Sequence, residues 1–404
     1  MIISYQFLLL FLAPVFFWLS IRHAVNHKNT LFLWQRLGMN LPAIENPVWF
    51  HCASVGEVIT AVPLITLYHK QFPEQSILLT TNTITGASIC KQKLPFASHS
   101  FLPLDYRLIT RLFLNKIKPQ KLIIMETELW PNLLQLCRLK KIPVNIINGR
   151  LSQRSLNINS WSKSVYKTTL SHVDKIYCRS DSDADAYQSL GATDQQTETV
   201  GNLKFSAELD LPAADNLIGR PYVLAASTHA GEEKIIVELW NKTNHDNLLL
   251  VIAPRHPERK NDILTDIAVL TRDVKVRSLQ QDITDDTSVY LADTLGELPA
   301  LFQHAEFIIM GGSFVAKGGH NILEPAALSK AITYGPSMEN FAAEDLLFRK
   351  NNAAIQITAD QQSVETINRV ISDTDFRQTL AKNALSVMQR NNNIADIYLQ
   401  KIMQ

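Results

Sequence analysis

The segment GGSFVAKGGHNILEPAA (311–327) places four glycines within nine residues, in a chain that has only 14 glycines among 404 residues. Glycine clusters of this kind are typical of a backbone that turns tightly or lets a ligand come close. The apolar run before it, 305–310, indicates a buried strand, and the run after it, through Leu328, indicates a helix. A strand, a glycine loop and a helix N-terminus can hold phosphate or sugar hydroxyls on backbone N–H groups. Glu324 would then reach ribose hydroxyls; the plainer interpretation is a tight connection with Glu324 at the helix dipole.

Outward from this segment, short apolar runs alternate with longer helical stretches. We predict strands at 48–53, 76–81, 121–125, 144–148 and 175–178 and, after 219–221, at 223–226, 248–253, 288–291 and 307–310. This alternation predicts an α/β fold with parallel sheets covered on both faces. Two series predict two facing, doubly wound Rossmann-like domains with a boundary near 203–220. Ligands bind outside the carboxyl ends of such strands, so we expect the site in the cleft between the domains.

The first 21 residues are almost all apolar or aromatic, and Arg22 is the first charged side chain. A run of about 20 such residues is long enough to cross a hydrocarbon core of about 30 Å. A cleaved signal peptide is the alternative, but the run lacks a basic start and a small-x-small site before Arg22. Arg22, Lys28 and Arg36 follow, with no acidic residue before Glu45. The positive-inside rule therefore predicts an uncleaved anchor with the remaining chain in the cytoplasm.

The net charge of +1 hides an asymmetry between the two halves of the chain. Residues 1–204 contain 21 Lys and Arg against 12 Asp and Glu, whereas the remainder contains 18 against 26. A basic half beside an anchor would be attracted to anionic lipid head groups or to a phosphorylated lipid substrate. The alternative is ordinary surface charge that happens to divide in this way. The four cysteines are widely spaced, which fits buried thiols in a reducing compartment.

Several unusual polar segments follow predicted strands or lie at the predicted domain junction. Glu57, after the first strand, is either an acidic residue at a helix start or a general base facing the cleft. Glu126 ends an apolar strand, where a carboxylate is costly unless it binds something. Lys204 lies at the domain junction and could face a phosphate or carboxylate, although most lysines are merely solvated. Arg255, between two prolines, is suited to rigid contact with phosphate.

Three histidines, His229, His256 and His320, fall in these segments and could suggest a metal. Their separations are long, and the sequence contains no H-E-x-x-H or H-x-H pair. We therefore interpret them as hydrogen-bonded histidines and expect no metal.

Taken together, the segments resemble the 3-deoxy-D-manno-octulosonic acid (Kdo) transferases of lipopolysaccharide biosynthesis. The matching segments occur in the family's order and spacing up to about Phe341, and the tail beyond about 345 is generic. They are SVGE (54–57), TTNTITGA (80–87), METELWPN (125–132), NGRLSQRS (148–155), GNLKF (201–205), STHAGEE (227–233), PRHPER (254–259), DTLGEL (293–298), GGS (311–313) and GGHNILEPAA (318–327).

The resemblance implies two facing Rossmann-like domains of GT-B glycosyltransferase architecture. It implies transfer of Kdo from CMP-Kdo to the lipid A precursor, an acylated and phosphorylated glucosamine disaccharide, with inversion. It places the enzyme at the cytoplasmic face of the inner membrane, with membrane lipids as partners, no nucleic acid, no metal and no cofactor. We expect the membrane anchor helix at 1–21, the acceptor-binding domain at 22–204 and the CMP-sugar-binding domain at 205–404.

Carried over by position, the family's base falls on Glu57, and its transition-state-stabilising residues fall on Glu126 and Lys204. Its CMP contacts fall on Pro254, Arg255, Leu295, Gly296, Glu297, Asn321, Ile322, Leu323 and Glu324. The departures from the family's pattern are mild: Gly149 replaces an expected alanine, Leu295 a methionine and Ile322 a proline. None of them changes a charged role.

Two alternatives stay open from the sequence. One is another sugar-nucleotide enzyme of this architecture, such as a lipid-linked N-acetylglucosamine transferase, which binding of UDP rather than CMP would reveal. The other is a membrane-anchored binding or scaffold protein that lost catalysis. The joint presence of Glu57, Glu126, Lys204 and Arg255 argues against the second. The number of Kdo residues added, the acyl-chain or phosphate preference for the acceptor and the oligomeric state cannot be predicted from the sequence. The sequence also leaves open whether the anchor spans the bilayer or lies within it.

Overall fold

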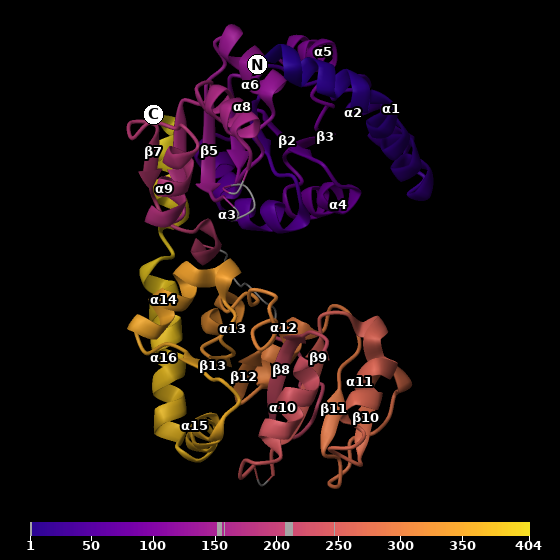
Figure 1. The fold of residues 1–404 in the computed structure, drawn as a ribbon, viewed down its shortest axis with the longest axis vertical. Helices are drawn as coiled ribbons and strands as arrows, with labels where there is room; N and C mark the ends of the chain where they lie inside the picture. The colour runs from indigo at the N-terminus through magenta and orange to yellow at the C-terminus, as the bar shows by residue number, and fades with distance from the viewer. Residues whose placement is uncertain (1, 152–155, 157, 207–212, 246) are drawn as a thin grey trace. The chain divides into compact units, whose positions relative to one another are not determined.

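A computed structural model describes residues 2–151, 156, 158–206, 213–245 and 247–404 of the chain (Figure 1). The segment 152–155 of the NGRLSQRS motif lies outside the described residues. The chain divides into two compact units, Met1–Ala207 with Asn392–Gln404, and Glu208–Asn391. Each unit contains one seven-stranded sheet.

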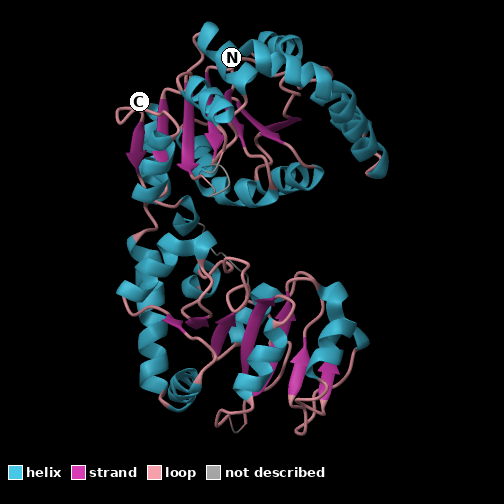
Figure 2. Cartoon of the chain, viewed as in Figure 1, coloured by secondary structure: helices cyan, strands magenta, loops and turns pink. Residues whose placement is uncertain are grey.

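The first unit is built on a parallel sheet with the strand order β3-β2-β1-β4-β5-β6-β7. Its central strands are buried along their whole length, and helices lie on both faces of the sheet, as Figure 2 shows. The elements are α1 (Ile2–Asn26), α2 (Thr30–Arg36), β1 (Val48–His51), α3 (Val55–Gln71), β2 (Ile77–Thr81), α4 (Ile84–Lys93), β3 (Ser98–Phe101), α5 (Arg107–Ile117), β4 (Lys121–Met125), α6 (Pro131–Leu139), β5 (Val144–Gly149), α8 (Ser160–Leu170), β6 (Lys175–Cys178), α9 (Asp181–Ser189), β7 (Thr197–Thr199), η1 (Leu203–Ser206) and α17 (Ile394–Met403).

The second unit repeats the plan with the order β10-β11-β9-β8-β12-β13-β14, again parallel in every described pair. Its elements are β8 (Tyr222–Thr228), α10 (Glu232–Trp240), β9 (Leu249–Pro254), η2 (Pro257–Arg259), α11 (Lys260–Ile267), β10 (Val274–Val276), η3 (Arg277–Leu279), β11 (Val289–Leu291), α12 (Leu298–His304), β12 (Phe307–Met310), α13 (Leu323–Ala327), β13 (Ala331–Tyr334), η4 (Glu339–Phe341), α14 (Ala342–Lys350), β14 (Ile355–Gln356), α15 (Gln361–Ser372) and α16 (Thr374–Arg390).

Each sheet has a point where the strand order reverses direction. In the first unit it lies between β1 and β4, and in the second between β8 and β12. Chain leaving neighbouring strands at such a point turns to opposite faces, which opens a crevice at their carboxyl ends. The segments that follow these four strands are therefore the first places to look for function.

The predicted α/β class and both sheets are confirmed, and every predicted strand is present within a few residues. Five strands were not predicted: β3, β7, β10, β13 and β14. Strands β3, β7, β10 and β14 are short or polar and form the edges of the two sheets, where one neighbour suffices. Strand β13 is buried and lies between β12 and the edge strand β14.

The predicted domain ranges differ from the structure at the C-terminus. Asn392–Gln404 belongs to the first unit, not to the second as its place in the sequence suggested. Helix α17 packs against α3 and η1, and its Tyr398 is fully buried there. The Tyr398 hydroxyl donates to Gly201 O at 2.9 Å and accepts from Asn148 N at 3.2 Å.

Helix α1 extends to Asn26, five residues beyond the predicted end of the anchor. Within the described residues, one helix is long and apolar enough to cross a membrane, and it is the part of α1 from Tyr5 to Asn26. It is not a separate body, because it belongs to the first unit and contacts α2.

Candidate functional site

Glu57 lies in the first turn of α3, directly after the segment that leaves β1 at the switch point. Ser54 caps this helix, and its hydroxyl donates to Glu57 Oε1 at 3.0 Å. The Ala53 N–H donates to Glu57 Oε2 at 2.8 Å. The carboxylate is thus held by two donors near the positive end of a 17-residue helix.

Burial raises the pKa of Glu57 from its ordinary value to about 7. The Ala53 hydrogen bond opposes this shift, the nearby Glu126 and Glu128 carboxylates add to it, and the Ser54 hydrogen bond again opposes it. A carboxylate with a pKa near 7 can both accept and release a proton at neutral pH. Gly56 does not have a positive φ, and a Cβ there would meet only Ser54 Oγ at 4.0 Å, so the space beside Glu57 stays open.

Glu126 directly follows β4 on the other side of the switch point. Its backbone is left-handed, with φ of +57°, which costs energy in a residue other than glycine. Glu126 N donates to Ile147 O, and Tyr187 Oη donates to Glu126 O at 3.0 Å, so the strained backbone is fixed from both sides. The Glu126 carboxylate has no hydrogen bond or ion pair within the described residues. Backbone strain at the carboxyl end of a strand is a reason to consider Glu126 as a candidate site residue.

Glu128, two residues on, is used within the protein. Its carboxylate accepts from Trp130 Nε1 at 2.9 Å and from Asn82 Nδ2 at 3.2 Å, and it lies 3.6 Å from His51 Nε2. These contacts explain why the second carboxylate of METELWPN is tolerated at the end of a buried strand. They leave Glu126 as the acidic side chain available to a ligand.

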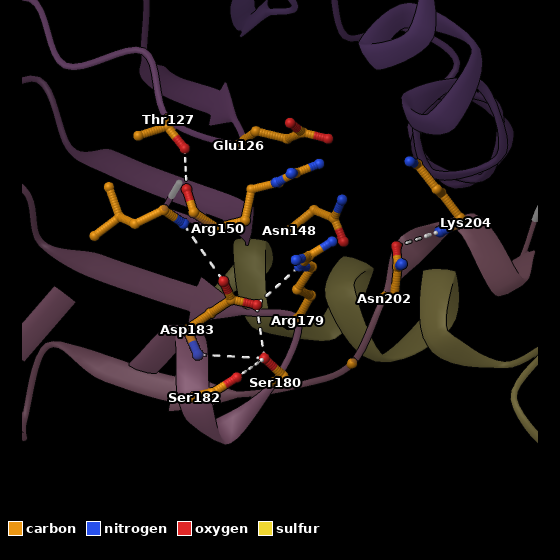
Figure 3. A network of polar contacts seen from close by, with 12 residues as sticks. Glu126, Thr127, Asn148, Arg150, Arg179, Ser180, Ser182, Asp183, Asn202 and Lys204 are labelled. Carbon is orange, nitrogen blue, oxygen red and sulfur yellow. Dashed lines mark hydrogen bonds and ion pairs between the residues drawn. The ribbon is translucent and has the colours of Figure 1, made fainter. Parts of the chain in front are cut away.

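Lys204 lies in η1, where the Asn202 side chain accepts from its N–H at 3.1 Å. The preceding residue, Leu203, donates its N–H to the side chain of Asn148, another left-handed residue, at 2.9 Å. Figure 3 shows the Lys204 side chain and the Glu126 side chain extending to the same side of the sheet. The structure thus brings Glu57, Glu126 and Lys204 to the carboxyl edge of one sheet.

Sequence reasoning missed Arg150, which directly follows β5 beside Glu126 (Figure 3). Thr127 Oγ1 donates to Arg150 O, which fixes the backbone of Arg150 against the METELWPN segment. Its half-buried guanidinium points toward Glu126 in Figure 3. Arg179 differs, because it donates to Asp183 at 2.8 Å and is held in the core. The signal for Arg150 was its place two residues after the strand predicted at 144–148.

In the second unit, three N–H groups of the glycine loop that follows β12 are bound within the protein and not available to a ligand. The N–H groups of Gly312, Ser313 and Phe314 donate to Glu232 at 2.6, 2.9 and 2.7 Å. Glu232, the first residue of α10, is fully buried and also accepts from His229 N at 2.8 Å. A protein carboxylate therefore occupies the anion site that the sequence suggested for phosphate, and this prediction was wrong for these three N–H groups.

The glycines still have a structural cause. A Cβ on Gly311 would lie 2.7 Å from the backbone of Ser227 and Thr228 on β8. Gly318 and Gly319 have φ of +84° and +79°, in the left-handed region. The loop thus packs directly against the end of the neighbouring strand at the switch point.

Arg255 follows β9 and is exposed, and its guanidinium has no partner among the described residues. The other arginine of PRHPER, Arg259, instead pairs with the buried Glu233 at 3.0 and 3.3 Å. Arg255 N donates to Thr228 O at 2.9 Å, which ties its backbone to the end of β8. One arginine of the motif is structural, and the other is free for a ligand.

The predicted nucleotide contacts lie along the same edge, with different accessibility. Asn321 Nδ2 donates to Glu324 Oε1 at 3.0 Å, and both side chains are half-buried. Leu295 is 83% exposed beside Gly296, and Glu297 pairs with Arg277 at 2.8 Å. The side chains of Pro254, Ile322 and Leu323 are buried, so a ligand could reach these residues only through their backbone.

The three histidines gather at this edge. His229 and His320 stack with ring centroids 5.0 Å apart, and their Nε2 atoms lie 2.9 Å apart; His256 packs at 5.6 Å from His229. Burial is the main cause that lowers the pKa of both His229 and His320, and it brings that of His320 to about 4. Neighbouring positive groups lower both pKa values further. Within the described residues no group of three His, Cys, Asp or Glu side chains could hold a metal ion.

Comparison with known proteins adds a functional class to this geometry. Residues 32–207 match the family described as 3-deoxy-D-manno-octulosonic-acid transferase (kdotransferase). The chain is 30% identical over 418 residues to the 3-deoxy-D-manno-octulosonic acid transferase of Rickettsia bellii, with 98% of each chain covered. It is 31% identical to that of Haemophilus influenzae, with 85% of this chain and 83% of the relative covered.

Among solved structures, the UDP-GlcNAc 2-epimerase from Neisseria meningitidis aligns with a TM-score of 0.60 at 13% sequence identity. The alignment covers 89% of this chain and 100% of the epimerase. At this identity the likeness concerns the fold alone, and it confirms the predicted GT-B architecture.

Proposed function

This chain belongs to the 3-deoxy-D-manno-octulosonic acid transferase family, and we propose that it transfers Kdo from CMP-Kdo to the lipid A precursor with inversion at the sugar. We further propose that it acts at the cytoplasmic face of the inner membrane, to which α1 attaches it. The observation that carries the mechanism is Glu57: a carboxylate with a pKa of about 7 at the switch point of the first sheet.

In the proposed step, Glu57 accepts the proton of an acceptor hydroxyl. The hydroxyl oxygen forms a bond to the anomeric carbon of Kdo while the bond from that carbon to the CMP phosphate oxygen breaks. CMP leaves with the bonding electron pair. Attack from the face opposite the leaving group inverts the configuration. The raised pKa supports this role, because a base near neutral pH combines sufficient ionisation with sufficient basicity.

The remaining charged residues support the two substrates. Glu126 and Lys204 extend from the carboxyl edge that carries Glu57, and we propose that they stabilise the reacting sugar. Arg255 is an exposed cation that directly follows β9 of the second unit, and we propose that it binds the CMP phosphate, whose negative charge grows as it leaves. Asn321 and Glu324 form a hydrogen-bonded pair suited to the ribose hydroxyls.

Incubation of the purified protein with CMP-Kdo and the lipid acceptor, followed by mass spectrometry and by NMR assignment of the anomer, tests the reaction. We expect Glu57→Ala to lower turnover by roughly 10²–10⁴-fold, the usual contribution of a positioned base. CMP affinity should stay near that of the unmodified protein, because the proposed CMP contacts all lie in the other unit.

Glu74→Ala is the matched control, since Glu74 is an exposed carboxylate just beyond the same helix. Near-normal turnover in a folded Glu57→Ala protein would refute the base assignment. Absence of a Kdo-bearing product with any acylated disaccharide would refute the proposed reaction.

A further inference from the structure

Helix α1 has an inner stripe that faces the first unit. Leu9, Ser20 and Ala24 are buried, and Ala13 and Phe16 between them are half-buried. Their spacing of three and four residues places all five on one side of a helix. A helix that only crossed a bilayer would have no reason to bury a continuous stripe against its own catalytic unit.

The N-terminal end of α1 is tied to this unit by polar contacts. Tyr5 Oη donates to Asp105 Oδ2 at 2.9 Å, and Gln6 Nε2 donates to Asn132 Oδ1. Tyr106 Oη donates to Leu9 O at 2.8 Å. Asp105 is itself buried, and it accepts from the N–H groups of Asn132 and Leu133 at the start of α6. The contact therefore joins α1 to a built part of the fold.

The C-terminal end of α1 is held by apolar packing. Ala24 forms a cluster with Phe32, Ala87 and Phe101, and the His23 ring lies 4.8 Å from the ring of Phe32. Both ends of α1 thus meet the same short segment of the first unit. The N-terminal end meets it at Asp105, and the C-terminal end meets it near Phe101.

These contacts are incompatible with a spanning orientation. Tyr5 and Ala24 are 19 residues apart, which corresponds to about 28 Å along a helix, nearly the ~30 Å of the hydrocarbon core. If α1 crossed the bilayer, Tyr5 and Ala24 would lie at opposite surfaces. Asp105 and Phe101 would then have to reach both surfaces at once, although only three residues separate them.

The outer face of α1 is apolar and exposed. Phe7, Phe11, Trp18 and Val25 are 69%, 82%, 56% and 67% exposed. On the neighbouring α5, Leu108 and Leu112 are exposed one turn apart, and Trp34 is exposed on α2. Four exposed cations lie close to these side chains in the sequence: Arg22, Lys28, Arg107 and Arg111. We call the exposed apolar residues of α1, α2 and α5 the outer apolar face.

We propose that α1 lies in the plane of an anionic lipid bilayer surface, with the outer apolar face inserted, and does not span the membrane. Apolar side chains bordered by Lys and Arg, with no acidic residue before Glu45, suit a surface of anionic head groups. This inference rests on the proposed function only in that α1 meets a membrane. It chooses between two orientations that the sequence left open, an anchor that spans the bilayer and one that lies within it.

Depth measurement separates the two orientations. Phe7, Phe11, Trp18 and Val25 lie on one stripe of the helix, so each is replaced by cysteine, one at a time, in the full chain and spin-labelled on phosphatidylethanolamine–phosphatidylglycerol vesicles. The four native cysteines are buried, which favours labelling at the introduced thiol. Collision with oxygen and with a water-soluble nickel complex then gives the depth of each label.

A helix in the interface gives four similar depths, roughly 5–10 Å below the head groups. In a spanning helix, label depth would increase from Val25 to a maximum near Phe11, where the label would lie about 10 Å or more deeper than at Val25. That profile would overturn the proposal. Val269→Cys, 83% exposed in the second unit, provides the water-exposed reference.

A second pair of variants tests the contribution of α5. Leu108→Ser with Leu112→Ser should weaken partition into the same vesicles by about tenfold or more, since two leucines leave the apolar phase. Leu346→Ser, 64% exposed in the second unit, is the control and should leave partition unchanged. Equal partition of the double variant and the control would count against the outer apolar face.

Neither measurement uses donor or acceptor. A protein that lies flat on vesicles but transfers no Kdo would refute only the proposed reaction. One that transfers Kdo in detergent but shows a spanning depth profile would refute only the orientation of α1.

Discussion

Replacing Ser54 with alanine is expected to move the acidic limb of the pH–rate profile toward higher pH. If Glu57 is the base, the rate follows its ionised fraction, and this fraction rises through the pKa of about 7. At pH 6 about one tenth of Glu57 is ionised. The unmodified enzyme should therefore lose about tenfold in kcat/KM for each pH unit below 7.

The size of the shift follows from the Ser54 hydrogen bond. The hydroxyl donates to Glu57 Oε1 at 3.0 Å and stabilises the ionised form. A hydrogen bond to a charged group contributes about 1.5–3 kcal/mol, and one pKa unit corresponds to about 1.4 kcal/mol. Because Glu57 is half-buried, we take the lower free energy, about 1.5 kcal/mol. We therefore expect the midpoint of the acidic limb to move up by about one pH unit.

The assay is initial-rate kinetics between pH 5 and 9 in detergent, with CMP release as the signal. Ser54→Thr keeps a hydroxyl and should leave the limb in place. Glu126→Gln removes a carboxylate that raises the pKa of Glu57, so its limb should move toward lower pH even if kcat falls. A limb that stays at the same pH in Ser54→Ala, or one already near pH 4.5 in the unmodified enzyme, would refute the reasoning.

Two further predictions concern the second unit. Arg255→Ala and Glu324→Ala should each weaken CMP binding in calorimetry by about 10-fold or more, since a charge-assisted contact contributes about 1.5–3 kcal/mol; unchanged affinity in both would contradict the assigned contacts. Glu232→Gln should lower the stability of the second unit by about 3 kcal/mol, because an amide cannot accept all four N–H groups that the buried carboxylate holds. Chemical denaturation measures this loss. Glu258→Gln, at an exposed carboxylate, is the control and should have no effect.

Much of the fold was predictable because the central strands are buried on both faces and appear as apolar runs. Lys121–Met125, Lys175–Cys178 and Phe307–Met310 match the predicted ranges. Strand β3, with the sequence SHSF, was not predicted because it lies at the edge of its sheet and needs little apolar surface. The prediction depended on burial, and it failed where burial was incomplete.

The candidate site was predictable in position but less so in detail. Glu57, Glu126 and Arg255 were expected because each follows a predicted strand, and the structure places each there. The hydrogen bonds that the glycine loop donates to Glu232 could not be predicted, because they join residues that are 80 or more positions apart in the sequence. A motif indicates that a backbone turns, but not which group its N–H atoms bind.

The return of α17 to the first unit has a consequence for synthesis of the protein on the ribosome. The second unit is one continuous stretch, whereas the first also needs Asn392–Gln404, which leave the ribosome after the whole second unit. Tyr398, which holds Asn148 and Gly201 next to the segment that carries Lys204, is among them. The second unit can therefore complete its fold before the unit that carries the proposed base, which also needs Asn392–Gln404. A frameshift just after the codon for Asn391 would leave the sequence of the second unit intact and deprive the first unit of α17.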